Sequence, residues 1–176
     1  NEAETAASLG IKASYLEKIP LPFKVKAAVR FDGQAHFHPR KYLLTLAREI
    51  PGSGCSIFEQ TRAINIEEGK TCSVLTSRNK KVTASNIIIA SHYPFYDWHG
   101  LYFTRIYTER SYALGVRINE KYPGGMYITA EDPTRSLRSQ PTKHGELVIV
   151  TGEHHKTGQG ENTLNHYRKL IDFACE

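Results

Sequence analysis

Residues 38–50, HPRKYLLTLAREI, decide how the chain is organised, because they contain its clearest helix. Pro39 suits the first helical position, where its fixed φ is helical and its missing N–H is not needed. The apolar side chains that recur at helical spacing would share one face: Tyr42, Leu43, Leu46, Ala47 and Ile50. Residues 51–54, PGSG, then end the helix. The segment therefore predicts an amphipathic helix with one face available to cover a sheet.

A series of short strands is expected to follow this helix. β-Branched and aromatic residues gather in four segments, at residues 55–59, 63–67, 72–77 and 82–90. Glu68-Gly69 and Arg78-Asn79 supply turns between them. A helix that leads into a meander and then into a hydrophobic strand predicts a sheet with a covering layer.

Further elements are expected on both sides of this region. Upstream, residues 2–9 predict a helix that ends at Gly10, and residues 25–31 alternate as a strand does. Downstream, the aromatic-rich residues 93–107 suit a crossover between two sheets. The remaining chain predicts three strands and a last amphipathic helix, at residues 111–118, 125–130, 146–152 and 162–175.

Composition excludes several classes of function. The 176 residues are 40% hydrophobic, which is enough to bury a core. No apolar run reaches the ~18 residues that a membrane span needs, and the N-terminus does not resemble a signal peptide. The formal charge of +5 comes from Lys and Arg scattered among acids, which does not favour a nucleic-acid partner. We therefore expect a soluble, cytoplasmic protein with no membrane span.

A metal site is not expected. The cysteines, Cys55, Cys72 and Cys175, are few and widely spaced, which argues against a disulfide framework or structural zinc and fits a reducing cytoplasm. His36 and His38 would share one side of a strand, but no third ligand lies near them. His38 is better placed to cap the helix that follows it.

The order and spacing of several segments resemble a known family. These are GQAHFHPRKYLLTLA at 33–47, SIFEQTRAINIEEG at 56–69, TASNIIIASHYPF at 83–95, YTERSYALGVRI at 107–118, SLRSQP at 136–141 and ELVIVTGEHHKTGQ at 146–159. Together they resemble the FAD-dependent oxidoreductases of the D-amino-acid oxidase (DAO) family, and most of all its bacterial members with a C-terminal Rieske iron–sulfur domain.

The resemblance implies an α+β fold derived from α/β architecture. Residues 1–92 would be part of a Rossmann-like FAD-binding domain that lacks its N-terminal G-x-G-x-x-G unit. Residues 93–160 would be an antiparallel substrate-binding sheet, and residues 161–176 a helix leading back to a missing C-terminal part. The family's backbone contact to the adenine of FAD falls on Ala63, with Arg62 beside it.

The resemblance also implies contacts near the flavin itself. Ala90 and Ser91 match the family's strand end of Ala-Thr-Gly, where small residues let the cofactor run close to the backbone. His92 stands where the family has Gly, which is a departure from the pattern. His38 would lie near the flavin in the complete enzyme.

Substrate contacts would come from the antiparallel sheet. Tyr112, Arg138 and the pair His154-His155 lie on matching segments. An Arg there would bind a substrate carboxylate in a fork geometry, and Arg138 is the preferred candidate, with Arg135 as competitor. His155 is the second catalytic candidate. Adjacent strand residues face opposite sides, so only one of the two histidines can reach a given site.

The implied reaction is oxidation of an amine or amino acid by hydride transfer to flavin. The sequence contains neither the G-x-G-x-x-G loop nor the Cys/His pairs of a Rieske cluster, so we expect an internal fragment that is inactive alone and pairs as a homodimer. The alternative is a non-catalytic module that binds a small molecule or a protein.

Overall fold

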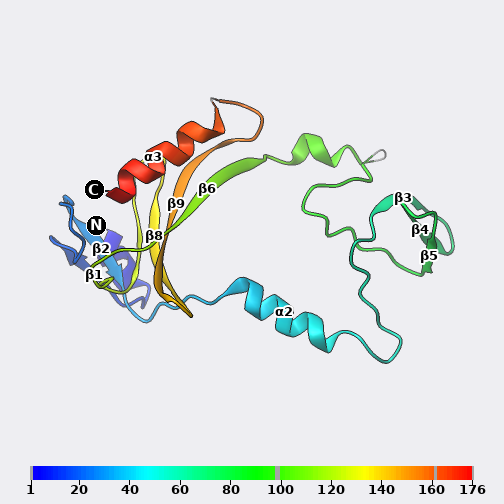
Figure 1. Cartoon of the computed structure of the whole chain (residues 1–176), viewed down its shortest axis with the longest axis horizontal. Coiled ribbons are helices and arrows are strands. Elements are labelled where there is room, and N and C mark those ends of the chain that lie inside the picture. The colour runs from blue at the N-terminus through cyan, green and yellow to red at the C-terminus, as the bar shows by residue number, and fades with distance from the viewer. Residues whose placement is uncertain (1, 98–99, 161, 176) are drawn as a thin grey trace. The chain divides into compact units, whose positions relative to one another are not determined.

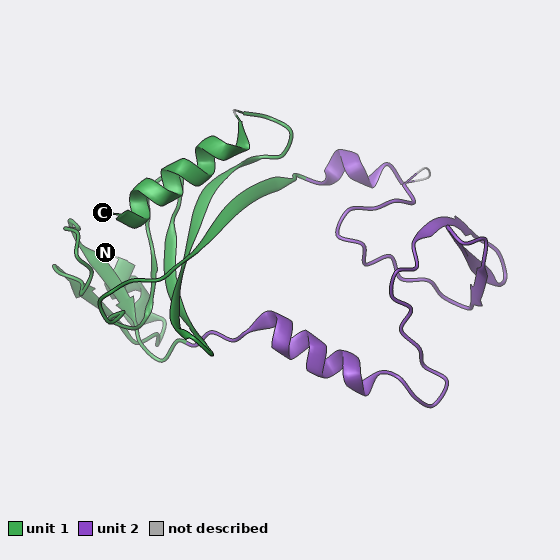
Figure 2. Ribbon diagram, viewed as in Figure 1, with its two compact units in different colours: residues 1–34, 107–176 green, residues 35–106 purple. Residues whose placement is uncertain are grey.

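The computed structural model describes residues 2–97, 100–160 and 162–175. The chain forms two compact units, one of residues 1–34 and 107–176 and the other of residues 35–106 (Figure 2). We call them unit 1 and unit 2 and describe each by itself.

Unit 1 is built on a four-stranded antiparallel sheet with the strand order β6-β9-β8-β7. Its strands are β6 (Glu109–Val116), β7 (Met126–Ile128), β8 (Ser136–Thr142) and β9 (Gly145–Lys156). Helix α3 (Thr163–Cys175) lies along one face of this sheet (Figure 1). Of the described elements, only α3 packs against the sheet. The sheet therefore has a covered face, towards α3, and an open face.

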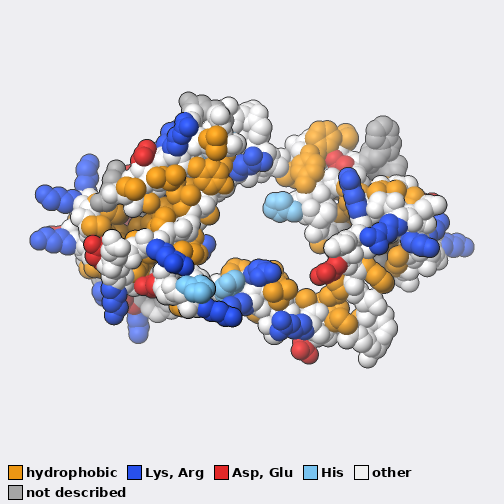
Figure 3. Space-filling model, in the orientation of Figure 1, with side chains coloured by type: hydrophobic (Ala, Val, Ile, Leu, Met, Phe, Trp, Pro, Cys, Tyr) orange, Lys and Arg blue, Asp and Glu red, His pale blue; other side chains and the backbone are white. Residues whose placement is uncertain are grey.

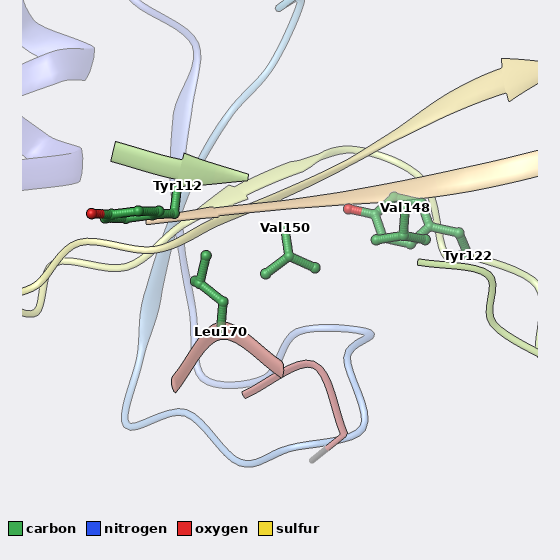
Figure 4. Close-up of a cluster of buried hydrophobic side chains, with 5 residues drawn as sticks. All are labelled: Tyr112, Tyr122, Val148, Val150 and Leu170. Carbon is green, nitrogen blue, oxygen red and sulfur yellow. The ribbon is translucent and has the colours of Figure 1, made fainter. Parts of the chain in front are cut away.

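The core of unit 1 lies between the covered face and α3. Leu170 is fully buried and rises from α3 towards Val150, while Tyr122 lies beside Val148 (Figure 4). Tyr112 closes the cluster at the other end. Hydrophobic side chains gather between α3 and the strands of this unit in the space-filling view (Figure 3). Every second residue of each strand points into this layer, because successive side chains of a strand face opposite sides of the sheet.

The N-terminal part of unit 1 is a short helix and a hairpin. Helix α1 (Glu2–Ser8) precedes the antiparallel pair β1 (Ala13–Leu16) and β2 (Ala28–Phe31). Phe23, between the two strands, meets Phe173 of α3 with ring centroids 5.8 Å apart. This contact joins the N-terminal residues to the C-terminal helix.

Unit 2 contains a helix, a small sheet and a single turn of 3-10 helix. Helix α2 (Pro39–Glu49) is followed by the antiparallel meander β3 (Ala63–Glu67), β4 (Cys72–Thr76) and β5 (Lys81–Ala84), and later by η1 (Tyr102–Arg105). His38 caps α2 as expected, because its Nδ1 accepts a hydrogen bond of 3.4 Å from the Lys41 N–H.

Helix α2 buries none of its side chains. The stripe that we expected to cover a sheet is exposed, with Leu43 60% and Ile50 50% accessible. Exposed apolar stripes of this kind favour association. The homodimer stays a prediction.

The strand predictions are correct in part. The meander strands at 63–67 and 72–77 are confirmed, but residues 55–59 form no strand, because only an isolated bridge between Gly52 and Cys55 ties this segment. Of the strand expected at 82–90, only β5 forms. Residues 85–90 find no partner strand among the described residues, and Ile88 is 89% exposed.

The fold class is a mixture of helices with antiparallel sheets, as expected, since every described strand pair is antiparallel. The Rossmann-like origin of residues 1–92 stays a prediction. The contacts group the chain differently from the expected parts, because residues 1–34 belong with the C-terminal sheet. No described helix is long and apolar enough to cross a membrane.

Candidate functional site

The open face of the four-stranded sheet is the candidate functional site of unit 1. In the register, Arg138 lies opposite Ile149 on one side and Met126 on the other, and Ile149 lies opposite Gly115. The neighbouring rows hold Ser136 with Thr151, and Gln140 with Leu147. The side chains at the open-face positions of these rows are Ala113, Gly115, Met126, Ile128, Ser136, Arg138, Gln140, Leu147, Ile149 and Thr151.

Arg138 is the one charged side chain in these rows of the described sheet. It is exposed, and no acidic side chain of the described residues pairs with it. An Arg guanidinium offers a planar fork of donors that matches a carboxylate. The open face therefore presents an available anion-binding group in apolar surroundings.

Arg135, the competing candidate, is already occupied. It comes just before β8 and points to the covered face, where its Nε and Nη2 donate to Oε1 of Glu153 at 3.2 and 2.8 Å. Its guanidinium also lies over the Phe173 ring, 4.9 Å from the centroid. The structure thus separates the two arginines by face, and Arg138 is the one left free for a ligand.

Small and hydroxyl side chains shape the rest of the open face. Ser136 and Thr151 form a hydrogen-bonded hydroxyl pair next to Arg138. At Gly115, an added Cβ would come within 3.0 Å of a Leu147 methyl. The glycine therefore lets the Leu147 side chain pack directly against the backbone of β6. Sequence reasoning missed these residues. The period-2 pattern of ELVIVT could have placed Leu147, Ile149 and Thr151 on one face, but pairing them with Arg138 required the register.

A β-bulge on the covered face holds a buried carboxylate. Two β9 residues, Glu153 and His154, oppose a single β6 residue between Arg110 and Tyr112. Glu153 has a φ of 55° and is 2% exposed. Beyond Arg135, its Oε2 lies 3.6 Å from His166 Nδ1 and 4.0 Å from Lys169 Nζ, both on α3. The bulge therefore anchors α3 and the start of β8 together.

His155, the second catalytic candidate, lies on the covered face. Its Nδ1 is 2.9 Å from the Lys156 carbonyl, which can only accept, so Nδ1 carries the proton. The Tyr112 hydroxyl then donates to Nε2 at 2.9 Å. The ring also stacks on His166, with centroids 4.5 Å apart. His155 and Arg138 are thus not brought together, and the packing supports a structural role for His155.

His154, on the bulge, points elsewhere. Its Nε2 is 3.7 Å from a carboxylate oxygen of Asp132, which is 93% exposed. The expectation that the two adjacent histidines diverge is confirmed, since only His155 reaches Tyr112. No group of His, Cys, Asp and Glu suited to a metal ion occurs among the described residues.

The predicted adenine contacts of FAD lie at the edge of the small sheet in unit 2. Ala63 begins β3, an edge strand, and pairs with Thr76 of β4. The Arg62 carbonyl accepts from the Ser77 N–H at 2.9 Å. Because β3 is paired on one side only, part of its backbone N–H and C=O groups is left for a ligand. This arrangement fits a backbone contact at Ala63.

The predicted flavin contacts lie in an exposed connection of unit 2. Ala90 and Ser91 are exposed and small, and Ser91 Oγ donates to the Tyr93 carbonyl at 2.7 Å. His92, which stands where the family has Gly, adopts a φ of 64°. Glycine favours that left-handed region, so a Gly would adopt this backbone conformation more readily than His92 does. These residues fit a close approach by a cofactor.

An open hollow in unit 2 contains none of the predicted site residues. It measures about 570 Å³ and is lined by Ile66 and Cys72 of the sheet, by residues 85–87, and by Tyr96 and Tyr102. Burial raises the pKa of the Tyr96 phenol, and the nearby Glu68 carboxylate raises it further. The lining mixes polar and apolar groups without a convergent cluster, so it does not by itself indicate a reaction.

The fold and these sites define a class of protein: an α+β chain with a helix-backed antiparallel sheet whose open face carries Arg138, an Arg that is unpaired among the described residues. Comparison with known proteins identifies it further. The family described as FAD dependent oxidoreductase (DAO) matches residues 2–176. The chain therefore belongs to the DAO family of FAD-dependent oxidoreductases.

Two relatives are informative. A Bacillus subtilis (strain 168) protein that carries the name Rieske 2Fe-2S iron-sulfur protein YhfW is 37% identical over 173 residues, which are 98% of this chain and 34% of that protein. The chain thus spans about a third of its length. A Rhizobium meliloti (strain 1021) protein named as the oxidoreductase OrdL is 32% identical over 62 residues, or 35% of this chain and 14% of that protein. No solved structure matches the chain.

Proposed function

We propose that the protein containing this chain is an FAD-dependent oxidoreductase that oxidises an amine or amino acid. The observation that carries the proposal is the free Arg138 on the open face of a sheet in a chain that matches the FAD-dependent family along its length. FAD, when bound, supplies the hydride acceptor.

The chain's own residues would hold and orient the reactants. Arg138 binds the substrate carboxylate and fixes its direction on the open face. Ala63, with Arg62 beside it, offers backbone groups to the adenine, and Ala90 and Ser91 give the flavin a close path. His38, which caps the N-terminus of α2, precedes these segments in the sequence. The rows around Arg138 hold no carboxylate or imidazole among the described residues, so the open face orients the substrate and supplies no base.

The electron acceptor proposed for the intact protein is a Rieske domain in the same chain. The name of the Bacillus relative supports this, and its greater length leaves room for such a domain. Iron and acid-labile sulfide in the purified intact protein would be the expected finding. The scattered free cysteines and the bacterial relatives support a bacterial, cytoplasmic protein.

The proposal is tested on the intact protein. We expect it to be yellow, with a flavin absorbance that bleaches when an amine or amino acid is added without oxygen, while the 176-residue chain alone is colourless and inactive. Ser91→Trp should lower the flavin content, because a large side chain blocks the close path. Ser56→Trp, at another exposed position of unit 2, is the matched control. An intact protein that contains no flavin would refute the proposal.

The second candidate is a non-catalytic module that binds a small anion or a protein. It is favoured by the exposed apolar stripe of α2, which suits a partner surface. Flavin that is present but is not reduced by any amine would favour this second function over the first.

A further inference from the structure

We propose that Tyr112 and His155 form a redox pair that takes up oxidising equivalents from one-electron oxidants, such as peroxyl radicals, and so protects the chain. The Tyr112 phenol loses an electron while its proton passes to His155, and Tyr167 connects the pair to solvent. The inference is carried by the 2.9 Å contact between the Tyr112 hydroxyl and His155 Nε2, in a buried site with an aromatic route to the surface. It goes beyond the proposed function, because unit 1 holds all three groups and no flavin or substrate takes part.

His155 is prepared to accept the proton. A phenol gives up an electron more easily when its proton leaves in the same step, because the phenol radical cation is a strong acid. The Nδ1–H of His155 donates to the Lys156 carbonyl at 2.9 Å, which leaves the Nε2 lone pair for the Tyr112 proton. After the transfer, the Lys156 carbonyl and the Tyr112 oxygen accept from the two N–H groups of the imidazolium. The ring is half-buried, so water also reaches the group that becomes charged.

Tyr122 lacks such a base, although it is buried to the same extent. Both tyrosines are 5% exposed. The Tyr122 hydroxyl donates to the Gly125 carbonyl at 3.4 Å, and a carbonyl oxygen is too weak a base to take the proton of a phenol. Oxidation of Tyr122 would therefore leave the proton on the radical cation. Of these two tyrosines, Tyr112 has the partner that oxidation requires.

Tyr167 supplies the route between Tyr112 and solvent. It lies on α3 and is 39% exposed, and its ring meets the Tyr112 ring edge-on with the centroids 4.9 Å apart. The Tyr112 hydroxyl points away from Val150 and Leu170 (Figure 4). An electron can therefore pass between two aromatic rings in contact without crossing the aliphatic core. Imidazole is a stronger base than water, so the oxidising equivalent comes to rest on Tyr112 rather than on Tyr167.

The electrons and protons balance in two steps. The oxidant takes one electron from Tyr167, and the phenol proton goes to water. The Tyr167 radical then takes one electron from Tyr112 and one proton from water, which restores its phenol. In the same step the Tyr112 O–H bond breaks and an N–H bond forms at His155 Nε2. A one-electron reductant such as ascorbate reverses the change, because the electron and the His155 proton return to the Tyr112 oxygen.

Electron paramagnetic resonance of the 176-residue chain tests the pair, with tris(bipyridine)ruthenium(III) formed by light as the oxidant. We expect a neutral tyrosyl radical that ascorbate removes. Tyr112→Phe should abolish the long-lived part of the signal, while Tyr122→Phe, the control of equal burial, should keep it. Tyr167→Phe should slow the appearance of the radical several-fold. In heavy water, the hyperfine spectrum should contain one deuteron that is hydrogen-bonded to the radical oxygen.

Two results would overturn the redox pair. One is a Tyr112→Phe variant that is folded by circular dichroism and keeps the radical yield and lifetime of the unaltered chain. The other is a radical without a hydrogen-bonded deuteron in the unaltered chain, which needs no variant to fold. A purely structural hydrogen bond would leave the radical signal independent of Tyr112.

Protection has its own measurement. Under the same light, dityrosine-linked dimers should accumulate faster in Tyr112→Phe than in Tyr122→Phe, because the oxidising equivalent then stays on exposed tyrosines. Mass spectrometry and dityrosine fluorescence measure the dimers. Equal dimer formation in the two variants would refute the protective role.

Discussion

Arg135 and Glu153 form an ion pair on the covered face of the sheet, where Nε and Nη2 of Arg135 both donate to Glu153 Oε1. The Nη2–Oε1 distance is 2.8 Å, and the Glu153 side chain is 2% exposed. The pair joins the start of β8 to the bulge of β9. The backbone of Arg135 is also held, because its N–H donates to Thr129 Oγ1 at 2.9 Å and its carbonyl accepts from the Thr129 N–H at 2.8 Å. We call this ion pair, with the two hydrogen bonds to Thr129, the clamp. It fixes the position of the residue just before β8, and so the strand register that places Arg138 on the open face.

Glu153→Ala is expected to destabilise the chain by about 2–3 kcal/mol, because it leaves the Arg135 guanidinium beside α3 without its carboxylate. The expected loss is lower than for a fully buried pair, since the Arg135 side chain keeps 27% of its accessibility. Urea unfolding of the chain measures it. Glu120→Ala, at an exposed position, should cost little. Equal unfolding midpoints for the two variants would contradict the role of the clamp.

Gly152→Ala should destabilise the same bulge by steric conflict, at a cost of about 1–3 kcal/mol. An added Cβ at Gly152 would lie 2.8 Å from the Thr134 carbonyl oxygen and 2.9 Å from Arg135 Cγ. Neither the backbone nor the clamped side chain can yield easily. Gly69→Ala is the matched control, because its Cβ would meet nothing closer than 3.5 Å. Thermal unfolding of both variants is the measurement, and a Gly152→Ala variant as stable as the control would refute the close approach.

Tyr112→Phe should cost about 1–2 kcal/mol, because it leaves the His155 Nε2 without its donor in a partly buried site. Since the ring is kept, its stacking on His166 is unchanged, and the loss isolates the hydrogen bond. Tyr107→Phe serves as control, since Tyr107 is 67% exposed. The His155 ring nitrogens, followed by nitrogen-15 NMR, should also report a change of environment at Nε2 only. A variant without either effect would show that the Tyr112 hydroxyl and the His155 Nε2 form no stabilising hydrogen bond.

The elements with a strong local signal were predictable from sequence. Pro39 and the apolar period marked α2, and its cap at His38 was anticipated. The turn at Arg78-Asn79 was found because Asn tolerates the left-handed backbone, and Asn79 indeed has a φ of 56°. These features depend on a few neighbouring residues, which a sequence displays directly.

Elements that depend on distant partners were not predictable in the same way. β8, with the polar sequence SLRSQPT, carries no strong strand pattern and forms because β9 pairs along its whole length. Conversely, the run at 87–89 has the composition of a buried strand but remains unpaired among the described residues. The sequence alone suggested Arg138 as a site residue. It could not show that His155 and Arg135 lie on the opposite face of the sheet, because that depends on the register of the paired strands.

Tyr122 gives the chain a predictable response to alkaline pH. Burial, with Tyr127 and Glu146 as further causes, raises the pKa of Tyr122 from 10.0 to about 12. A raised pKa means that the folded state favours the neutral phenol more than the unfolded state does. The resulting stabilisation is complete below the unfolded pKa and is lost as pH rises through the folded value.

The stability of the chain should therefore fall as pH rises from about 10 towards about 12, in part because buried Tyr122 must ionise. Tyr122→Phe removes this phenol, so its unfolding free energy should depend less steeply on pH in that interval than that of the unaltered chain. Tyr107→Phe, at a 67% exposed position, should keep the original slope. Urea unfolding at a series of alkaline pH values measures all three. Parallel curves for the chain and Tyr122→Phe would show that Tyr122 ionises as easily in the folded as in the unfolded state, against its place beside Val148 in the core.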